Sequence, residues 1–244
     1  METNQETWYS FTTRSFIFEG RESIIIEPTV ADDKRNWIWR ARFFGVEPQV
    51  DLALLNAGFH VVYTDVSDWF GAPKAVEHWN RFYQYITLTE GLNKKVVLEG
   101  FSRGGLIVYN WASANTGKVS CMYLDAPVCD FNSWPRGYGK ADRYQDEWKN
   151  CLEAYGITEE EALSYKGLPV YNCKEIARAN IPVLHVCGTA DEVVPLDENS
   201  LIVEQRIKKA GGSIKMILKE GIGHHPHCLK DPSPIVEFIL EHST

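Results

Sequence analysis

The feature that most constrains this fold is the alternation of short apolar runs with longer amphipathic segments along most of the chain. The short runs are rich in Val, Ile and Leu, as strands buried on both faces usually are. Parallel strands of this kind need long crossover connections, which are usually helices. The pattern therefore predicts an α/β fold with a mostly parallel central sheet and helices on both faces. We expect strands at 59–65, 94–100, 119–125, 181–187 and 213–218, and helices at 48–57, 72–90, 104–115, 195–210 and 233–241.

Two segments depart from this rhythm. Residues 15–28 have the pattern of a strand, a turn containing Gly20 and a second strand, which predicts an opening hairpin. Between 130 and 180 the chain inserts about fifty residues rich in Trp, Tyr and charge, where a short connection would suffice. Insertions of that length are usually functional, so we expect a cap over the C-terminal edge of the sheet. Because α/β domains often reach ~200–250 residues, we expect residues 1–244 to form a single domain.

Charge and hydropathy exclude several kinds of partner. The formal net charge is -8 and no Lys/Arg run exceeds a pair, which argues against nucleic acid. No stretch approaches the ~18–20 apolar residues of a membrane span. The polar start at 1–6 lacks the features of a signal peptide, so we expect a cytoplasmic protein, or a periplasmic or secreted one if a signal peptide has been removed. The six cysteines lack Cys-x-x-Cys spacing and are expected to be mostly free thiols.

The sharpest local motif is the pentapeptide Gly100-Phe101-Ser102-Arg103-Gly104. It follows an apolar strand directly and precedes a helical run, which is the context that a Gly-x-Ser-x-Gly motif requires. A strand-to-helix turn this tight presents the serine hydroxyl at its apex, and the flanking glycines let neighbouring chain approach without a Cβ clash. The motif therefore predicts that Ser102 is a catalytic nucleophile.

A serine nucleophile needs a base to accept its proton and an acid to orient that base. Asp191 lies on a loop after the strand at 181–187, and a histidine cluster follows the strand at 213–218. This order of serine, acid and histidine fits a hydrolase triad. The candidates for the acid are Asp191, Asp125 and Asp130, and those for the base are His224, His225 and His227.

These residues resemble the α/β-hydrolase superfamily over nearly the whole chain, from the hairpin to the last helix. Within it, the chain looks like compact serine esterases and is similar to bacterial hydrolases found with polysaccharide-degrading enzymes. The resemblance implies a single α/β-hydrolase domain in which Ser102 is the nucleophile, His224 the base after Gly223, and Asp191 the acid, acting through an acyl-enzyme. It is carried by the motifs Trp37-Ile38-Trp39-Arg40, Gly100-Phe101-Ser102-Arg103-Gly104-Gly105, Asp125-Ala126-Pro127-Val128-Cys129-Asp130 and His224-His225-Pro226-His227.

Two backbone N–H groups should stabilise the oxyanion. One is expected from Arg103, the residue after the nucleophile. The other is expected from the loop after the strand at 23–27, which lacks a His-Gly-Gly-Gly sequence, so we place it at Trp37 or Ile38. The side chains of Arg40 and Arg103 either add positive charge near the oxyanion or, for Arg103, form an ion pair inside the fold.

Several aromatic residues fall just after strand ends, where this fold places its pocket. Such residues are usually core, but their shared placement favours a platform that stacks a sugar ring. A His-x-His zinc pair is an alternative use of the histidines, although Cys228 and Asp231 do not complete a recognised ligand spacing, and we expect no metal and no cofactor. The residues expected to bind substrate are Trp39, Arg40, Trp69, Trp134 and His225.

The sequence thus predicts a serine esterase that removes a short acyl group, such as acetyl, from a carbohydrate-like substrate, with a small-molecule or oligosaccharide ester as its partner. The first alternative is a peptidase or lipid esterase of the same fold. A lipase usually has a more apolar cap than residues 130–180, and a peptidase of this type usually carries an extra domain, for which 244 residues leave no room. The second alternative is a non-catalytic, ligand-binding member of the fold.

Overall fold

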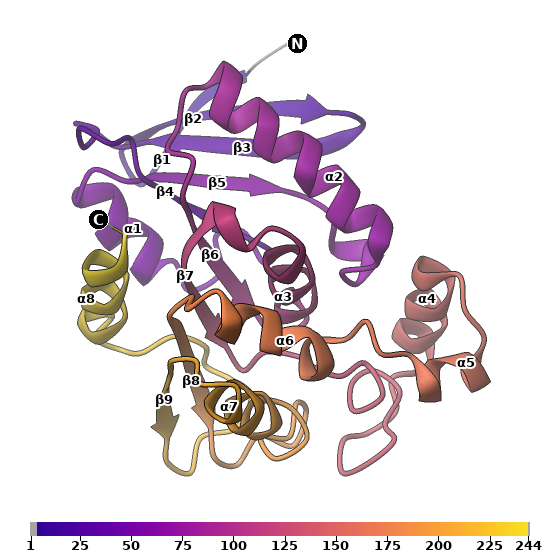
Figure 1. Cartoon of the computed structure of the whole chain (residues 1–244). Coiled ribbons are helices and arrows are strands. Elements are labelled where there is room, and N and C mark those ends of the chain that lie inside the picture. The colour runs from indigo at the N-terminus through magenta and orange to yellow at the C-terminus, as the bar shows by residue number, and fades with distance from the viewer. Residues whose placement is uncertain (1–3, 244) are drawn as a thin grey trace.

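A mostly parallel sheet forms the centre of the protein (Figure 1). The computed structural model describes residues 4–243, within which the sheet has nine strands in the order β1-β2-β3-β5-β4-β6-β7-β8-β9. The β1–β2, β2–β3 and β3–β5 pairs are antiparallel and the remaining pairs are parallel. The predicted fold class is confirmed. The strands are β1 (Asn4–Trp8), β2 (Phe11–Phe18), β3 (Arg21–Glu27), β4 (Trp37–Arg40), β5 (His60–Thr64), β6 (Val96–Phe101), β7 (Val119–Asp125), β8 (Val183–Gly188) and β9 (Ile214–Lys219).

Helices cover both faces of the sheet, as the alternating pattern predicts (Figure 1). One face carries α1 (Gln49–Asn56) and α8 (Ser233–His242), and the other carries α2 (Pro73–Gln84), α3 (Gly104–Ala114), α6 (Pro169–Arg178) and α7 (Ser200–Lys209). A separate cluster of buried apolar side chains lies between the sheet and each helical layer. The expected helix at 72–90 is present as α2 followed directly by a π-helical turn, η2 (Tyr85–Thr89). Short 3-10 turns are η1 (Ser67–Trp69) and η3 (Thr116–Lys118).

Two strands lie where the sequence predicted none. β1 reads Asn-Gln-Glu-Thr-Trp and has no alternation of apolar and polar residues, so no pattern marks it. β4 is four residues long and lies in a segment expected to be a loop. It pairs with β5 on one side and β6 on the other, and all four of its residues are buried. The sequence pattern does not indicate β4 as a central strand, because it has only four residues and ends in a charged one.

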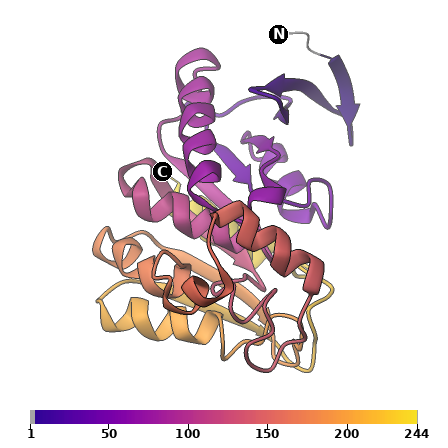
Figure 2. The same ribbon diagram turned by 90° about the vertical axis from the view of Figure 1, so that its right-hand side faces the viewer.

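The cap expected at 130–180 includes one helix, α6, that does not belong to it. Within this segment α4 (Gln145–Tyr155) and α5 (Glu159–Ser164) stand out beyond the edge of the sheet, and Figure 2 views the molecule from that side. In contrast, α6 packs between α3 and α7 and buries Cys173, Ile176 and Ala177 in the core. The helix α6 therefore belongs to the layer that covers the sheet, and the part beyond the sheet is residues 130–165.

Other expectations concern the environment of the chain. Among the helices of residues 4–243, none combines the length and apolar character that crossing a bilayer demands. All six cysteines are free and buried, as expected. Residues 1–3 of the polar start lie outside the described part of the chain.

Candidate active site

Ser102 sits at a strained turn between β6 and α3. Its φ is +50°, a left-handed backbone that costs a non-glycine residue roughly 1–3 kcal/mol and persists only where the surroundings enforce it. Here its N–H donates to the Asp125 carbonyl at 2.9 Å, and its carbonyl accepts from the N–H groups of Gly105 and Val128, also at 2.9 Å. The neighbouring strand and the first turn of α3 therefore hold the serine at the apex.

Glycines let the surrounding chain close on this turn. A Cβ on Gly100 would lie 2.9 Å from Val108 Cγ2, and a Cβ on Gly105 would lie 2.6 Å from Pro127 Cβ. Real Cβ contacts are essentially never that short, so both positions require glycine. A Cβ on Gly104 would lie 3.4 Å from Ala41 Cβ, which is close to ordinary contact. The two positions at which packing requires glycine are thus Gly100 and Gly105. On the helix side, this is one residue after Gly104, the glycine of the motif.

The structure brings the three expected triad residues together. His224 Nε2 lies 3.0 Å from Ser102 Oγ, and His224 Nδ1 lies 2.8 Å from Asp191 Oδ2. The other Asp191 oxygen accepts the backbone N–H groups of Val193 and Val194 at 3.0 and 2.8 Å, which fixes the carboxylate. With Nδ1–H donating to Asp191, the Nε2 lone pair points at the serine hydroxyl, which is the arrangement of a general base.

The loops that carry the acid and the base touch at Gly188. The loop of His224 passes so close that a Cβ on Gly188 would lie 2.2 Å from the Ile222 carbonyl oxygen. The N–H of Ala190 also donates to that carbonyl at 2.9 Å. No local pattern marks Gly188, because its role depends on a residue more than thirty positions away in the chain.

The other candidates for acid and base have other partners. Asp125 is fully buried and binds His227 Nδ1 at 2.9 Å and the Cys228 N–H at 2.8 Å. Asp130 accepts the backbone and side-chain N–H groups of Asn132 at 2.8 and 3.1 Å. His225 is exposed, with its ring centroid 4.9 Å from that of His224 and 4.7 Å from that of His227. A second acid–histidine pair therefore lies directly beside the triad.

The expected oxyanion donor at Trp37 is wrong. Trp37 is the first residue of β4, fully buried at the end of the strand remote from Ser102, and its indole N–H donates to the Asn93 carbonyl at 2.7 Å. Ile38 is likewise buried within the strand. The chain leaves the sheet three residues later, after the Ala41 N–H donates to the Glu99 carbonyl at 2.9 Å.

Arg42 is better placed than Trp37 or Ile38 to be the second donor. Its backbone nitrogen lies 3.9 Å from the position of a Cβ on Gly104, two residues from the nucleophile. Among residues 4–243, the backbone N–H groups of Arg42 and Arg103 find no hydrogen-bond acceptor. Both groups are free to donate to an oxyanion at the edge where β4 and β6 end.

Arg40 does not reach substrate, contrary to expectation, because only 1% of its side chain is exposed. Its Nη1 donates to Asp51 at 2.5 Å, and Nε donates to the carbonyls of Arg42 and Phe43 at 3.2 and 3.1 Å. Glu99 lies 3.5 Å from Nη1, and burial raises the pKa of Glu99 well above its ordinary value. Arg40 therefore anchors the loop that carries the Arg42 N–H.

The expected aromatic platform is only partly present. Trp39 is fully buried and stacks on Trp79 in the core with ring centroids 3.8 Å apart, so its expected role in substrate binding is wrong. Trp69 is half-buried beneath the Arg21 guanidinium, which lies 3.8 Å from the ring centroid. Trp134 is mostly buried, and the Arg103 guanidinium lies 5.8 Å from its ring. Trp134 thus lies beside the side chain of Arg103, the residue that follows Ser102.

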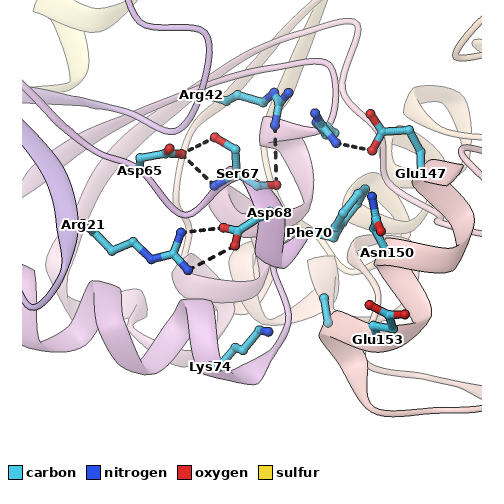
Figure 3. A pocket seen from close by; sticks show the side chains of 12 residues that line it. Arg21, Arg42, Asp65, Ser67, Asp68, Phe70, Lys74, Glu147, Asn150 and Glu153 are labelled. Carbon is cyan, nitrogen blue, oxygen red and sulfur yellow. Dashed lines mark hydrogen bonds and ion pairs between the residues drawn. The ribbon is translucent and has the colours of Figure 1, made fainter.

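A polar cavity of about 710 Å³ opens beside Arg103, between η1 and α4 (Figure 3). Arg21 and Asp68 face each other across one wall with two contacts of 2.7 and 3.1 Å, and the Arg103 guanidinium donates to Glu147 on α4 at 2.6 Å. Of the two roles expected for the Arg103 side chain, the structure therefore shows the ion pair inside the fold. The walls combine the cations of Arg21, Arg42, Lys74 and Arg103 with the carboxylates of Asp65, Asp68, Glu147 and Glu153.

Comparison with known proteins supports this fold and motif. The model of the prolyl oligopeptidase family matches residues 84–241. No curated protein sequence matches the chain.

Three solved structures show the fold at low sequence identity. An acylaminoacyl peptidase from Pyrococcus horikoshii has 16% identity and a TM-score of 0.69 over 96% of this chain and 42% of that chain. A puromycin-hydrolyzing peptidase from Mycobacterium tuberculosis has 14% identity and a TM-score of 0.72 over 94% and 38%. A cold-adapted esterase from an Arctic intertidal metagenomic library has 14% identity and a TM-score of 0.64 over 100% of both chains. The chain spans less than half the length of the two peptidases.

The Gly188 contact predicts a sensitive position outside the triad. In Gly188→Ala the new Cβ must displace the backbone that precedes His224, so kcat for 4-nitrophenyl acetate should fall by about 10²-fold, the usual cost of a displacement near 1 Å. Gly117→Ala is the matched control, because nothing lies within 4 Å of its Cβ position. Equal kcat values for the two variants, both folded by circular dichroism, would contradict the assigned contact.

The backbone donor at Arg42 is tested by comparing a variant that loses the backbone N–H with one that keeps it. Arg42→Pro should lower kcat by about 10²–10³-fold, as the loss of an oxyanion donor does. Arg42→Ala lacks the same side chain but keeps the N–H, so its kcat should fall much less. If steady-state kinetics give the two variants the same kcat, Arg42 is not the second donor.

Proposed function

The chain belongs to the prolyl oligopeptidase family and is a serine hydrolase of the α/β-hydrolase fold, and we propose that it cleaves carboxylic esters of small acyl groups on polar, carbohydrate-like alcohols. The observation that carries this proposal is the contact of Ser102 with His224 at 3.0 Å, together with a cavity of charged side chains whose lining includes Arg103, the residue after Ser102. We further propose Ser102, His224 and Asp191 as the catalytic triad.

The chemistry follows from the contacts. As Ser102 Oγ attacks the ester carbonyl, its proton moves to His224 Nε2, and the Asp191 carboxylate stabilises the imidazolium through Nδ1–H. The backbone N–H groups of Arg103 and Arg42 donate to the oxyanion that forms. The carbon–oxygen bond to the alcohol then breaks, and the proton on His224 Nε2 passes to the departing alkoxide. A water molecule next gives its proton to His224 and attacks the acyl-enzyme, which releases the acid and regenerates Ser102.

The charged and hydrogen-bonding groups of the cavity favour a polar substrate. Asp68 and Glu147 are engaged by Arg21 and Arg103, and Asp65 accepts the Ser67 hydroxyl. Asp68 and Glu147 are therefore not free to bind the amino group of a peptide. Within residues 4–243, Asp65 and Glu153 pair with no cation, and Arg42 and Lys74 pair with no carboxylate. Arginine, lysine and amide donors suit the hydroxyl and carbonyl oxygens of a sugar ester, whereas a lipid chain would leave them without partners.

A peptidase is the second candidate, and the family match favours it. The matched family is described as prolyl oligopeptidases, and two of the similar structures are an acylaminoacyl peptidase and a puromycin-hydrolyzing peptidase. The triad geometry serves amide and ester cleavage alike. The distinction between the two candidates therefore depends on the leaving group, which the cavity beside Arg103 would contact.

Covalent labelling tests the nucleophile. A fluorophosphonate probe should label the native chain at one site, and Ser102→Ala should abolish the labelling, because only the serine activated by His224 attacks the probe. Ser133→Ala is the matched control, since the Ser133 hydroxyl is engaged by Glu198 at 2.6 Å, and it should label like the native chain. Labelling of folded Ser102→Ala, detected by in-gel fluorescence and mass spectrometry, would overturn the assignment.

A substrate panel tests the ester proposal against the peptidase. We expect kcat/KM on acetylated oligosaccharides and 4-nitrophenyl acetate to exceed that on N-acetylated and free amino-acid 4-nitroanilides by at least ~10²-fold, which corresponds to about 2.7 kcal/mol of transition-state binding. Acyl chains of eight or more carbons should be poorer substrates than acetyl. A higher kcat/KM on the anilides would establish the peptidase instead.

A further inference from the structure

Three histidine rings meet on the loop that follows β9. One ring nitrogen each from His224, His225 and His227 lies within 4.8 Å of those of the other two. The ring centroids are 4.7 to 4.9 Å apart and the rings are nearly perpendicular, so they do not stack on one another. His224 and His227 are buried, whereas His225 is exposed and leaves the cluster open to solvent.

Two of these rings are oriented by buried carboxylates. His224 Nδ1 lies 2.8 Å from Asp191 and His227 Nδ1 lies 2.9 Å from Asp125. A carboxylate at Nδ1 holds the proton there, which leaves the lone pair of the neutral ring at Nε2. The same carboxylate–histidine arrangement orients the ligands of zinc in metalloproteins and makes them more basic. The loop therefore presents two preoriented nitrogen donors and a third, exposed donor beside them.

We propose that His224, His225 and His227 bind one divalent transition-metal ion of the Zn²⁺ class, and that the bound ion switches the hydrolase off. Zn²⁺ takes imidazole nitrogens at about 2.0–2.1 Å, which places three tetrahedral donors roughly 3.4 Å from one another. The observed separations, up to 4.8 Å, require a modest closure of the cluster. The exposed His225 ring can approach the other two because no described partner other than the two histidine rings holds it, and His224 and His227 close on the ion by small rotations against their carboxylates.

Metal binding and catalysis compete for one lone pair. The Nε2 lone pair of His224 faces Ser102 Oγ at 3.0 Å and is the group proposed to accept the serine proton. An ion coordinated at this nitrogen occupies the lone pair, so the proton of Ser102 then has no acceptor. The metal is thus an inhibitor of this site and is not needed for turnover. The inhibitory part of this inference rests on the proposed function, whereas the binding part does not.

Binding is tested without reference to activity. Calorimetric titration of Zn²⁺ into Ser102→Ala, which retains all three histidines, should show one ion per chain. His225→Ala and His227→Ala, each made in the Ser102→Ala background, should weaken the affinity at least tenfold, and Asp125→Asn by about 10–100-fold through loss of ring orientation. His242→Ala, which changes a histidine of α8 outside the cluster, should bind Zn²⁺ unchanged.

If His225→Ala and His227→Ala both bind as tightly as their parent, or if no ion binds, the site does not exist. Because His227 is buried, a folding defect in His227→Ala would leave His225→Ala and His225→Gln as the deciding variants. Mg²⁺ and Ca²⁺, which prefer oxygen ligands, should not compete for the site. Tetrahedral absorption bands with Co²⁺ in the same variants give a second measure of the ligand set.

Inhibition is tested by the ratio of each variant's hydrolysis rate with Zn²⁺ to its own rate without metal. At a Zn²⁺ concentration about 100 times the dissociation constant, the native rate should fall about 100-fold and recover on adding EDTA. At that same concentration, His225→Ala should lose no more than about tenfold. Full activity of the native chain with one Zn²⁺ bound would overturn the switch. A chain that binds Zn²⁺ at the cluster but hydrolyses no ester or amide would instead overturn the proposed function.

Discussion

The backbone of Ser102 in a left-handed conformation is the constraint on which the rest of the site depends. This conformation is unfavourable for a residue with a Cβ, and it is maintained by hydrogen bonds to Asp125 and Val128 and by glycines that allow the chain to close around the turn. The position of the hydroxyl is therefore determined by β6, β7 and the start of α3 together. Every other part of the site is a loop that must approach this one point.

The loop after β4 approaches it through a buried arginine. The Arg40 guanidinium donates through Nη1 to Asp51 and through Nε to the carbonyls of Arg42 and Phe43 in the loop after β4. A buried ion pair contributes little net stability once desolvation is counted. Its value here is geometric, because the planar guanidinium fixes several carbonyls at once and so directs the free N–H of Arg42.

The loop after β9 approaches the same point through Gly188, where only a glycine leaves room for the backbone before His224. The same loop carries His225 and His227, and a second carboxylate, Asp125, orients His227. A neutral histidine whose Nδ1–H donates to a carboxylate presents its Nε2 lone pair, which can serve as a general base or as a metal ligand. The regulation inferred for this site is thus a consequence of the same geometry that is proposed to make it a catalyst.

The α/β alternation with most of its strands and helices, the Ser102 turn and the chain order of serine, acid and histidine were predictable from the sequence, because periodicity and motifs are local and chain order constrains the triad. The structure brings Asp191 and His224 to Ser102, while their catalytic roles stay predictions. Tertiary structure alone decided that Trp37, Trp39 and Arg40 are buried in the core, whereas the sequence indicated that they face a pocket. They form a central strand whose neighbours are distant in the chain: β6 supplies Glu99, α1 supplies Asp51 and α2 supplies Trp79. Whether a Trp or an Arg is core or contact surface depends on such long-range register, which no local pattern contains.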